Sequence, residues 1–289
     1  MGYDSNMVAD GAKGRQPATV SATVSATAGF SQSLERGLQI LAVFNESRPV
    51  LGIADIARAV DLNKSTTYRY VATLARLDYL QQDPETKKYS LGPRVADLGF
   101  AAINSMEITR VAARPLQALA DETGHTVSMA VLDGSDIVYV DRRRSARGVH
   151  QGMELNLHVG SRLPAYCTAL GKVLLAYRDP ATLRMLLDRT DLARRAPKTI
   201  TAREQLTFAL ARIREVGIGV NDEELAPGLR AIAAPVRARS GEVIAAVNIV
   251  VYLSIATAPM EQLSARLEAP LRRTTTDISA RLGYRSESS

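Results

Sequence analysis

Several residues of the 289-residue sequence have the chemistry of catalytic groups, but none has the partners that catalysis requires. Cys167 is the single cysteine, and no base near it in the sequence could generate a thiolate, so buried packing is favoured. Gly171-Lys172 lacks the glycine at position 166 and the hydroxyl residue at position 173 of a phosphate-binding loop. The acidic run at 222–224 has no histidine or nucleophile partner, which favours a structural loop. We therefore expect a protein that is not an enzyme and needs no cofactor.

Composition narrows the alternatives further. A single cysteine argues against a disulfide framework and fits a reducing cytoplasm. A metal site is also not expected, because the three histidines, His125, His150 and His158, are widely spaced. No apolar run reaches the roughly 20 residues that a bilayer crossing needs, so we expect a cytoplasmic protein with no membrane partner. The formal net charge of +6 weakly favours a polyanionic partner.

One short segment combines the residue types that contact DNA. Residues 64–69 carry hydroxyl groups that can donate to phosphates or base edges, flanked by two cations. The candidate contacts in this segment are Lys64, Ser65, Thr66, Tyr68 and Arg69. A second cationic pair, Lys87 and Lys88, lies between two short β-prone runs and could reach the DNA backbone.

Three short helices and a hairpin are predicted to position these residues. The apolar spacing indicates a helix capped by Ser33, a second over 53–60 and a third over 64–77, whose apolar face ends at Leu77. With a hairpin at 79–91 they make a winged helix-turn-helix over 31–92, in which the third helix enters the major groove. Acidic residues nearly equal basic ones here, so a winged helix used for protein contacts stays an alternative.

The rest of the chain is predicted to be a disordered tail at 1–30, a linker helix at 93–107 and an α+β domain at 108–285. The linker carries an apolar stripe, suited either to self-association or to packing on its own chain. The domain is expected to have a mainly antiparallel sheet. Its predicted strands are 125–132, 136–141, 154–159, 231–238 and 243–252, and its predicted helices are 108–123, 165–177, 181–187, 201–216 and 259–282.

Ordered blocks along the chain resemble the IclR-type bacterial transcriptional regulators over residues 33–283. They include Val-Gly-Ser-Arg-Leu-Pro at 159–164 and Ala-Leu-Gly-Lys at 169–172. Further blocks are residues 33–41, 65–69, 89–92, 221–224 and 232–236. The resemblance implies a winged helix-turn-helix, a linker helix and a GAF-like effector domain. It also implies a homodimer, often paired into tetramers, that binds double-stranded DNA at a palindromic operator, and it adds Arg36 to the DNA-binding set.

The resemblance further implies a small organic acid as effector. The effector-binding positions it implies are Leu155, Leu163, Ala169, Leu170, Asn221, Leu229, Ala231, Asn248 and Val250. Asn221 replaces a usual acidic residue, and Asn248 and Val250 replace serine-type residues. The string 162–176 is similar to the branch that governs protocatechuate, 4-hydroxybenzoate and β-ketoadipate catabolism. A different catabolic pathway, or a sensor or enzyme that uses the winged helix for oligomerisation, stays an alternative.

A carboxylate site needs apolar walls and a few convergent donors. Asn248, Thr168, Tyr166 and the first N–H groups of the helix after Pro164 are candidate donors. The arginine run at 142–144 with Arg147 could bind an acidic ligand or DNA, although a solvated turn or a subunit contact is the favoured interpretation.

Overall fold

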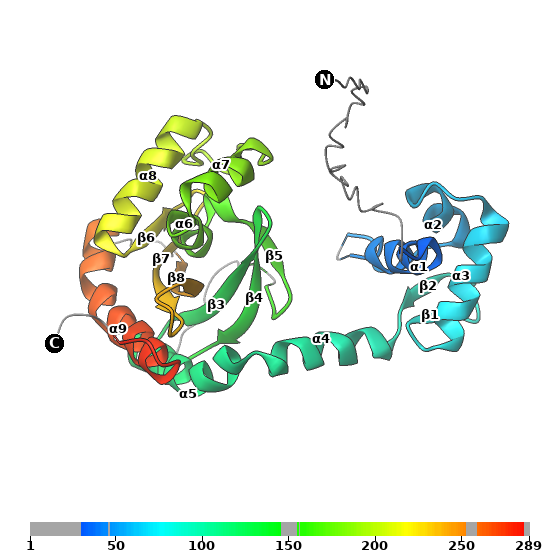
Figure 1. Cartoon of the computed structure of the whole chain (residues 1–289), viewed down its shortest axis with the longest axis horizontal. Coiled ribbons are helices and arrows are strands. Elements are labelled where there is room, and N and C mark those ends of the chain that lie inside the picture. The colour runs from blue at the N-terminus through cyan, green and yellow to red at the C-terminus, as the bar shows by residue number, and fades with distance from the viewer. Residues whose placement is uncertain (1–29, 46, 146–154, 156, 253–258, 286–289) are drawn as a thin grey trace, which may run out of the picture. The chain divides into compact units, whose positions relative to one another are not determined.

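The computed structural model describes residues 30–45, 47–145, 155, 157–252 and 259–285, and side chains except those of 100 and 103–105 within these ranges (Figure 1). All but the last residue of the predicted tail lie outside them. The chain divides into two compact units, residues 1–95 and 96–289. In the part that the structure describes, no helix has the length and apolar character that crossing a bilayer would take.

The N-terminal unit is a winged helix-turn-helix, as predicted. Its elements are α1 (Gln32–Ala42), α2 (Ile53–Ala59), α3 (Lys64–Arg76), β1 (Leu80–Gln82) and β2 (Tyr89–Leu91). The two strands pair antiparallel, with Gln81 opposite Ser90. Ile40, Ile56 and Val71, one from each helix, are fully buried, because the apolar face of every helix turns to the same small core.

Two local predictions for this unit are wrong. Helix α1 is capped by Ser31 and not by Ser33, since the Ser31 hydroxyl accepts a hydrogen bond from the backbone N–H of Leu34 at 3.3 Å. Leu77, expected on the apolar face of the third helix, is 53% exposed. The helix ends at Arg76, Leu77 is its C-cap residue, and Asp78 follows with a positive φ of 60°, so the helical periodicity no longer applies to Leu77.

Helix α4 (Pro93–Ser105) follows the winged unit, where the linker was predicted. Of its predicted stripe, Val95 is half-buried, whereas Leu98, Gly99 and Ala102 are exposed. Apart from Val95, the described side chains of this stripe are therefore exposed.

The C-terminal unit is an α+β domain with one six-stranded sheet in the order β5-β4-β3-β8-β7-β6, every neighbouring pair antiparallel. The strands are β3 (Thr126–Asp133), β4 (Asp136–Arg143), β5 (Arg162–Pro164), β6 (Gly219–Asp222), β7 (Leu229–Arg237) and β8 (Val243–Tyr252). The helices are α5 (Glu107–Thr123), α6 (Ala169–Ala176), α7 (Pro180–Asp188), α8 (Arg203–Val216) and α9 (Met260–Arg281), with a 3₁₀ turn, η1 (Ala165–Cys167), before α6. The predicted fold class is confirmed.

The sheet has a separate apolar core on each face. Helices α5 and α9 cover one face, and α6, with α8 behind it, covers the other (Figure 1). The alternation of β8 divides its side chains between the two, with Ala246 under α6 and Val247 on the opposite face. A polar residue on the α6 face of a central strand is therefore buried.

The predicted strand at 154–159 is wrong in its described part. Leu155 and residues 157–159 lie outside any strand, and β5 follows them. Gly160 adopts a positive φ of 92° in a turn, and its N–H donates to the carbonyl of Tyr139 at 2.8 Å. The chain enters the sheet only after this turn, as β5. His158 thus lies outside a strand, and His125 immediately precedes β3, contrary to the placement of both on strands.

The predicted helix at 165–177 and the predicted loop at 221–224 also need correction. Thr168 has an extended backbone (φ −120°, ψ 147°) and separates η1 from α6, because its hydroxyl caps α6 by accepting from the N–H of Gly171 at 3.0 Å. Asn221 and Asp222 belong to edge strand β6, held by pairing with β7 despite their polarity. The other predicted helices and strands start and end within two residues of their predicted bounds.

Candidate functional site

The first turn of α3 presents the predicted DNA contacts. The Asn63 side chain caps the helix by accepting from the backbone N–H of Thr66 at 2.8 Å, and the Ser65 hydroxyl donates to the same oxygen at 2.9 Å. Lys64 is the first helical residue and is exposed, as is Ser65. This cap fixes the direction in which the start of the helix points.

The rest of α3 separates buried from exposed positions. Thr67 is fully buried in the unit's core, whereas the neighbouring Tyr68 is 58% exposed and Arg69 is exposed as well. Thr66 is half-buried. Since side chains three and four apart share a face of a helix, Ser65, Tyr68 and Arg69 form an outward polar surface.

Arg36 of α1 lies near this surface. The half-buried Arg36 neighbours Tyr70 of α3, whose pKa is lowered mainly by a hydrogen bond with the Ser33 side chain and further by the charges of Arg36 and Arg69. The charges of Arg36 and Arg69 both lower the pKa of Tyr70, so Arg36 lies close to the predicted DNA-contacting segment at 64–69.

The hairpin tip holds the two predicted wing lysines outward. The Asp83 carboxylate accepts from the N–H groups of Glu85 and Thr86 at 3.0 and 2.7 Å, and the Thr86 N–H is the main cause that lowers the pKa of Asp83. Lys87 has a left-handed backbone (φ 56°), and its N–H donates to the carbonyl of Asp83. Lys87 and Lys88 are both exposed at this ordered turn.

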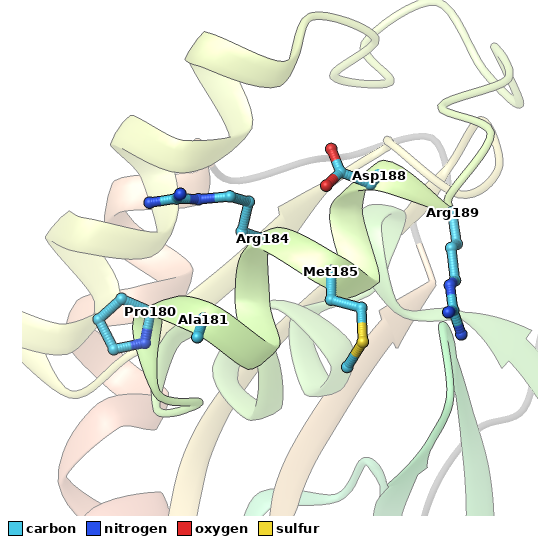
Figure 2. A pocket seen from close by; sticks show the side chains of 6 residues that line it. All are labelled: Pro180, Ala181, Arg184, Met185, Asp188 and Arg189. Carbon is cyan, nitrogen blue, oxygen red and sulfur yellow. The ribbon is translucent and has the colours of Figure 1, made fainter.

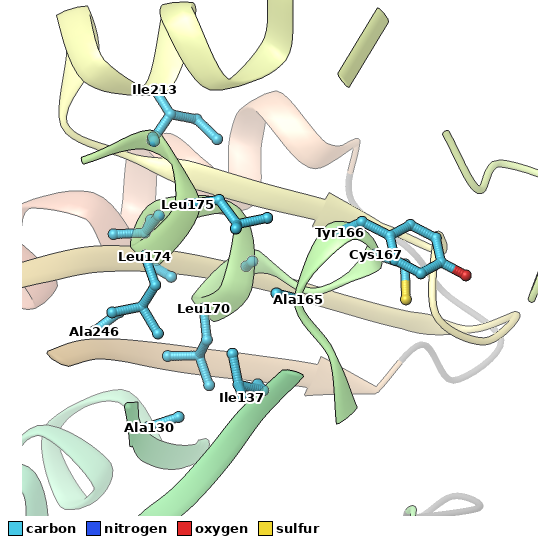
Figure 3. Close-up of a cluster of buried hydrophobic side chains, with 14 of the residues drawn as sticks. Ala130, Ile137, Ala165, Tyr166, Cys167, Leu170, Leu174, Leu175, Ile213 and Ala246 are labelled. Carbon is cyan, nitrogen blue, oxygen red and sulfur yellow. The ribbon is translucent and has the colours of Figure 1, made fainter. Parts of the chain in front are cut away.

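The predicted effector positions gather on the α6 face of the large sheet. Leu170 is fully buried and points from α6 toward Ile137, Ala130 and Ala246 (Figure 3). Ala169, Leu170, Leu229, Ala231 and Val250 belong to one buried cluster, and the half-buried Leu155 and Leu163 pack against it. Residues from α6, three strands and a connecting segment are therefore brought together.

The two predicted asparagines differ in their hydrogen bonding. Asn221 is 2% exposed; its Nδ2 donates to the carbonyl of Cys167 at 2.6 Å and its Oδ1 accepts from the N–H of Glu224 at 3.2 Å. This amide ties β6 to η1, which makes Asn221 a positioning residue. Asn248 is 4% exposed on central strand β8, and its Oδ1 has no hydrogen-bond partner within the described ranges.

Two other candidate donors are occupied within the chain. The Tyr166 hydroxyl donates to the carbonyl of Ala193 at 2.6 Å, and the Thr168 hydroxyl caps α6. The N–H groups after Pro164 belong to the single 3₁₀ turn η1 and do not start an α-helix, which corrects that prediction. Cys167 is fully buried, as predicted, and burial raises the pKa of its thiol to about 11.

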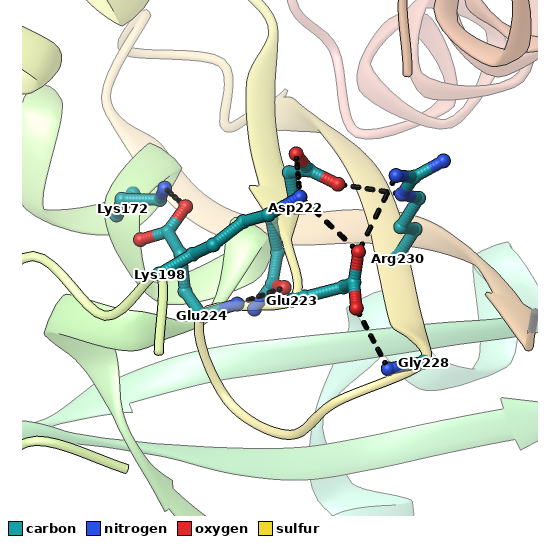
Figure 4. Close-up of polar contacts among 8 residues, drawn as sticks. Lys172, Lys198, Asp222, Glu223, Glu224, Gly228 and Arg230 are labelled. Atoms are coloured by element: carbon teal, nitrogen blue, oxygen red, sulfur yellow. Dashed lines mark hydrogen bonds and ion pairs between the residues drawn. The ribbon is translucent and has the colours of Figure 1, made fainter. Parts of the chain in front are cut away.

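A buried ion pair that was not predicted from the sequence fixes α6 to the turn after β6. The Nζ of Lys172 contacts Oε1 of Glu224, and these residues are 3% and 7% exposed (Figure 4). The available signal was an isolated lysine inside the strongly apolar stretch of α6, because a buried cation needs an anionic partner. Glu224 is that partner, 52 residues away.

An outer ion network surrounds the same turn (Figure 4). Lys198 contacts Asp222 at 2.8 Å and Glu223 at 3.2 Å, and Arg230 binds the same two carboxylates. The Gly228 N–H, followed by Lys198, lowers the pKa of Glu223. Burial alone would raise the pKa of Asp222, but Lys198 and Arg230 lower it on balance. These contacts support a structural role for the acidic run.

The arginine run has three distinct environments. Arg142 donates through Nη1 to the hydroxyl of Ser128 at 3.2 Å, whereas Arg143 forms two hydrogen bonds with Asp141 at 2.7 and 2.9 Å. Arg144 is exposed, and Arg147 lies outside the described residues. Arg142 and Arg143 belong to strand β4, so the run as a whole is not one solvated turn.

A surface hollow of about 560 Å³ lies elsewhere, over α7 (Figure 2). Its lining residues are Pro180, Ala181, Arg184, Met185, Asp188 and Arg189. All six are exposed, and none is a predicted effector position. The hollow lacks the buried polar groups that orient a small ligand.

A winged helix-turn-helix with an outward polar recognition helix, followed by an α+β unit with a second candidate site, is typical of DNA-binding transcriptional regulators. Two family models match the chain: "IclR helix-turn-helix domain" at residues 33–84 and "Bacterial transcriptional regulator IclR C-terminal" at residues 100–280. The chain belongs to the IclR family of transcriptional regulators, which confirms the resemblance.

Individual relatives agree with this assignment. The chain is 37% identical to the Pca regulon regulatory protein of Pseudomonas putida, covering 79% of this chain and 77% of that protein. It is 35% identical to the transcriptional regulator XynR of Escherichia coli K12, covering 88% and 98%. A crystal structure of an IclR homolog from Microbacterium hydrocarbonoxydans complexed with 4-hydroxybenzoate matches with a TM-score of 0.73 and 26% identity, covering 86% and 98%.

Proposed function

We propose that this regulator controls genes of aromatic-acid catabolism, specifically of the β-ketoadipate pathway, in response to an aromatic acid or a β-ketoadipate-like acid. The similarity to the Pca regulon regulatory protein and the homolog bound to 4-hydroxybenzoate support this assignment. The similarity to XynR supports control of a different catabolic pathway as the second candidate. The protein acts in the cytoplasm without a cofactor, and it is not an enzyme.

The proposed DNA complex uses both exposed surfaces of the winged unit. The start of α3 enters the major groove, where Ser65, Tyr68 and Arg69 reach bases or phosphates. Lys87 and Lys88 bind the flanking backbone, and Arg36 is a further DNA-binding residue. A homodimer places two such units on a palindromic operator, and dimers pair into tetramers. The exposed apolar stripe of α4 is consistent with self-association.

The proposed effector response starts on the α6 face of the large sheet. An acid that binds there favours one arrangement of the domains over another, and the arrangements differ in how well they fit two half-sites. The proposed domains are a winged DNA-binding unit at 31–92, a linker at 93–107 and an effector domain at 108–285. The tail at 1–30 precedes them.

The observation that carries the DNA-binding proposal is the division of α3 between the buried Thr67 and the exposed Arg69. An operator would be selected from a random duplex library with the full chain. Arg69→Ala should then weaken operator binding by about 1–3 kcal/mol if Arg69 contacts a base. Arg76→Ala, an exposed change at the other end of α3, is the matched control. Equal gel-shift affinities for both variants would refute the role of Arg69.

The wing is tested through its salt dependence. Each phosphate contact that is lost lowers the slope of log affinity against log salt by about 1, so Lys87→Gln with Lys88→Gln should lower it by about 2. A slope equal to that of the unchanged chain would exclude the wing from the interface.

The effector site is tested by a thermal-shift screen of aromatic acids and ring-cleavage products. Leu170→Trp should abolish the response to any acid that binds, because a larger ring at this fully buried position fills the α6 face, and operator binding should remain. A normal effector response in this variant would refute the site, and consumption of the acid by the purified chain would favour an enzyme.

A further inference from the structure

Three polar side chains form one row across the centre of the six-stranded sheet. Ser128 of β3 is opposite Arg142 of β4 on one side and opposite Asn248 of β8 on the other. Directly opposed residues of antiparallel strands project from the same face. Two residues along the strands, Ala130 and Ala246 belong to the cluster beneath α6, so the polar row faces α6 as well.

A β-bulge turns Arg142 toward this face. Tyr139 belongs to the cluster beneath α6, and strict alternation along β4 from Tyr139 would place Arg142 on the opposite face. The register between β3 and β4 shifts after Met129, where Val140 is the extra residue. Such bulges re-aim side chains and are common beside functional sites. The hydrogen bond from Arg142 to Ser128 at 3.2 Å shows the result.

The row has hydrogen-bonding capacity that points to a ligand. Asn248 is 4% exposed, yet its Oδ1 has no hydrogen-bond partner among the residues that the structure describes. A buried amide oxygen without a hydrogen-bond donor is costly, which indicates that a bound molecule supplies one. A guanidinium carries five N–H donors, so Arg142 can hold a carboxylate while it also contacts Ser128.

Tyr139 and Asp141 are ionisable groups of β4 close to Arg142 in the sequence. Burial raises the pKa of Tyr139 far above its ordinary value, although the charge of Arg142 opposes this shift. The phenol is therefore neutral at physiological pH. The nearby carboxylate of Asp141 is bound by Arg143 through two hydrogen bonds.

We infer that Arg142 and Ser128 hold the carboxylate of the effector and that Oδ1 of Asn248 accepts a hydrogen bond from a hydroxyl group of the same molecule. This inference rests on the proposed function and narrows the effector to a hydroxylated carboxylic acid. Leu170 and Val250, which belong to the cluster on this face, provide an apolar surface for its carbon skeleton.

The charge is tested by pairing two changes, one in the protein and one in the ligand. Calorimetric titration of the full chain would use benzoate, the three monohydroxybenzoates, 3,4-dihydroxybenzoate and the corresponding carboxamides. Arg142→Met should weaken binding of the acids at least about 30-fold, because a buried charge pair is lost, and leave binding of the uncharged amides unchanged. Arg143→Met is the matched control and should keep the affinity for the acids.

The hydroxyl group is tested separately. The unchanged chain should bind a hydroxybenzoate about tenfold more tightly than benzoate, as one buried hydrogen bond predicts. Asn248→Ala should abolish this preference and keep the preference for acids over amides. A preference that survives in Asn248→Ala would overturn the assigned role of Oδ1.

Other outcomes separate this inference from the proposed function. Acid binding by Arg142→Met at the unchanged affinity would overturn the carboxylate assignment, while operator binding and effector response would keep the proposed function intact. If Arg142→Met does not fold, Arg142→Lys keeps the charge but loses the planar fork, and it should bind acids more weakly than the unchanged chain. If the chain binds its operator but none of these acids, both this inference and the aromatic-acid effector are refuted. DNA binding would stand.

Discussion

The recognition segment on α3 and the α6 face of the large sheet hold polar side chains in opposite ways. Lys64, Tyr68 and Arg69 project from the surface of a small unit. Asn248 and Lys172 are 4% and 3% exposed inside the larger unit. A change of one of these exposed α3 side chains should therefore act mainly on binding, whereas a change near α6 should act on folding and binding together.

The difference follows from the size of the partners. DNA is a large polyanion that can approach an exposed surface, and its phosphates supply much of the affinity. A small acid buries most of its surface when it binds, so its polar contacts must be built inside the protein. Polar groups in such a place need partners in the folded chain or in the ligand.

The largest expected effect is on the buried ion pair. Lys172→Met leaves Glu224 buried without its cation and should destabilise the C-terminal unit by about 3–5 kcal/mol. Lys198→Met removes a half-exposed cation from the same turn and should cost far less stability than Lys172→Met, because water screens its contacts.

The single thiol gives the measurement, because Cys167 is fully buried and its pKa is raised to about 11. Its reaction with a thiol reagent in increasing urea reports opening of this unit. Equal midpoints for the two lysine variants would mean that the α6 side of the molecule is no more sensitive than its surface.

A glycine in α6 tests packing without any charge. A Cβ on Gly171 would lie 2.2 Å from the backbone of Ala165, so Gly171→Ala forces η1 and α6 apart and should cost about 1–3 kcal/mol. Gly99→Ala on α4 meets open space and should stabilise its helix by about 0.5–1 kcal/mol. Urea unfolding of both variants checks the opposite signs, and a neutral Gly171→Ala would contradict this close packing.

The cap of α3 should give a smaller effect. Asn63→Ala removes the acceptor for the N–H of Thr66 and should destabilise the winged unit by about 1 kcal/mol. Because the cap also directs Lys64 and Ser65, operator affinity should fall with it. Ser31→Ala removes the equivalent cap of α1 and should cost similar stability with less effect on operator binding. Equal losses of affinity would show that α3 has no special role.

The smallest effect should appear in acid. Burial, and then Arg266, lowers the pKa of His125, and Arg266 donates to Nε2 of the neutral ring. The stability from this lowered pKa is complete above the ordinary value of about 6.5 and is lost as pH falls through the lowered value. All three histidines lie after residue 95, so only the C-terminal unit should show this loss. His125→Gln should flatten the pH dependence of its thiol-detected unfolding midpoint, and an unchanged dependence would exclude His125.

Local patterns predicted much of the fold. The third helix and the hairpin were predicted to within one residue at each end, because their apolar spacing and turn residues are local. Residues 154–159 alternate like a strand, yet the turn at Gly160 keeps the described ones out of the sheet. The helix predicted over 165–177 is interrupted at Thr168, because a threonine side chain is better suited to cap a helix than to lie inside one.

The sequence by itself determined the family, the order of the main elements and the exposed polar segment of α3, since each depends on residues close together in the chain. Only the tertiary structure decided which distant polar groups meet. Lys172 pairs with Glu224, 52 residues away. The bulge at Val140 places Arg142 on the same face of the sheet as Ser128 and Asn248. Strand register and burial arise from packing across the whole unit, and no local periodicity contains them.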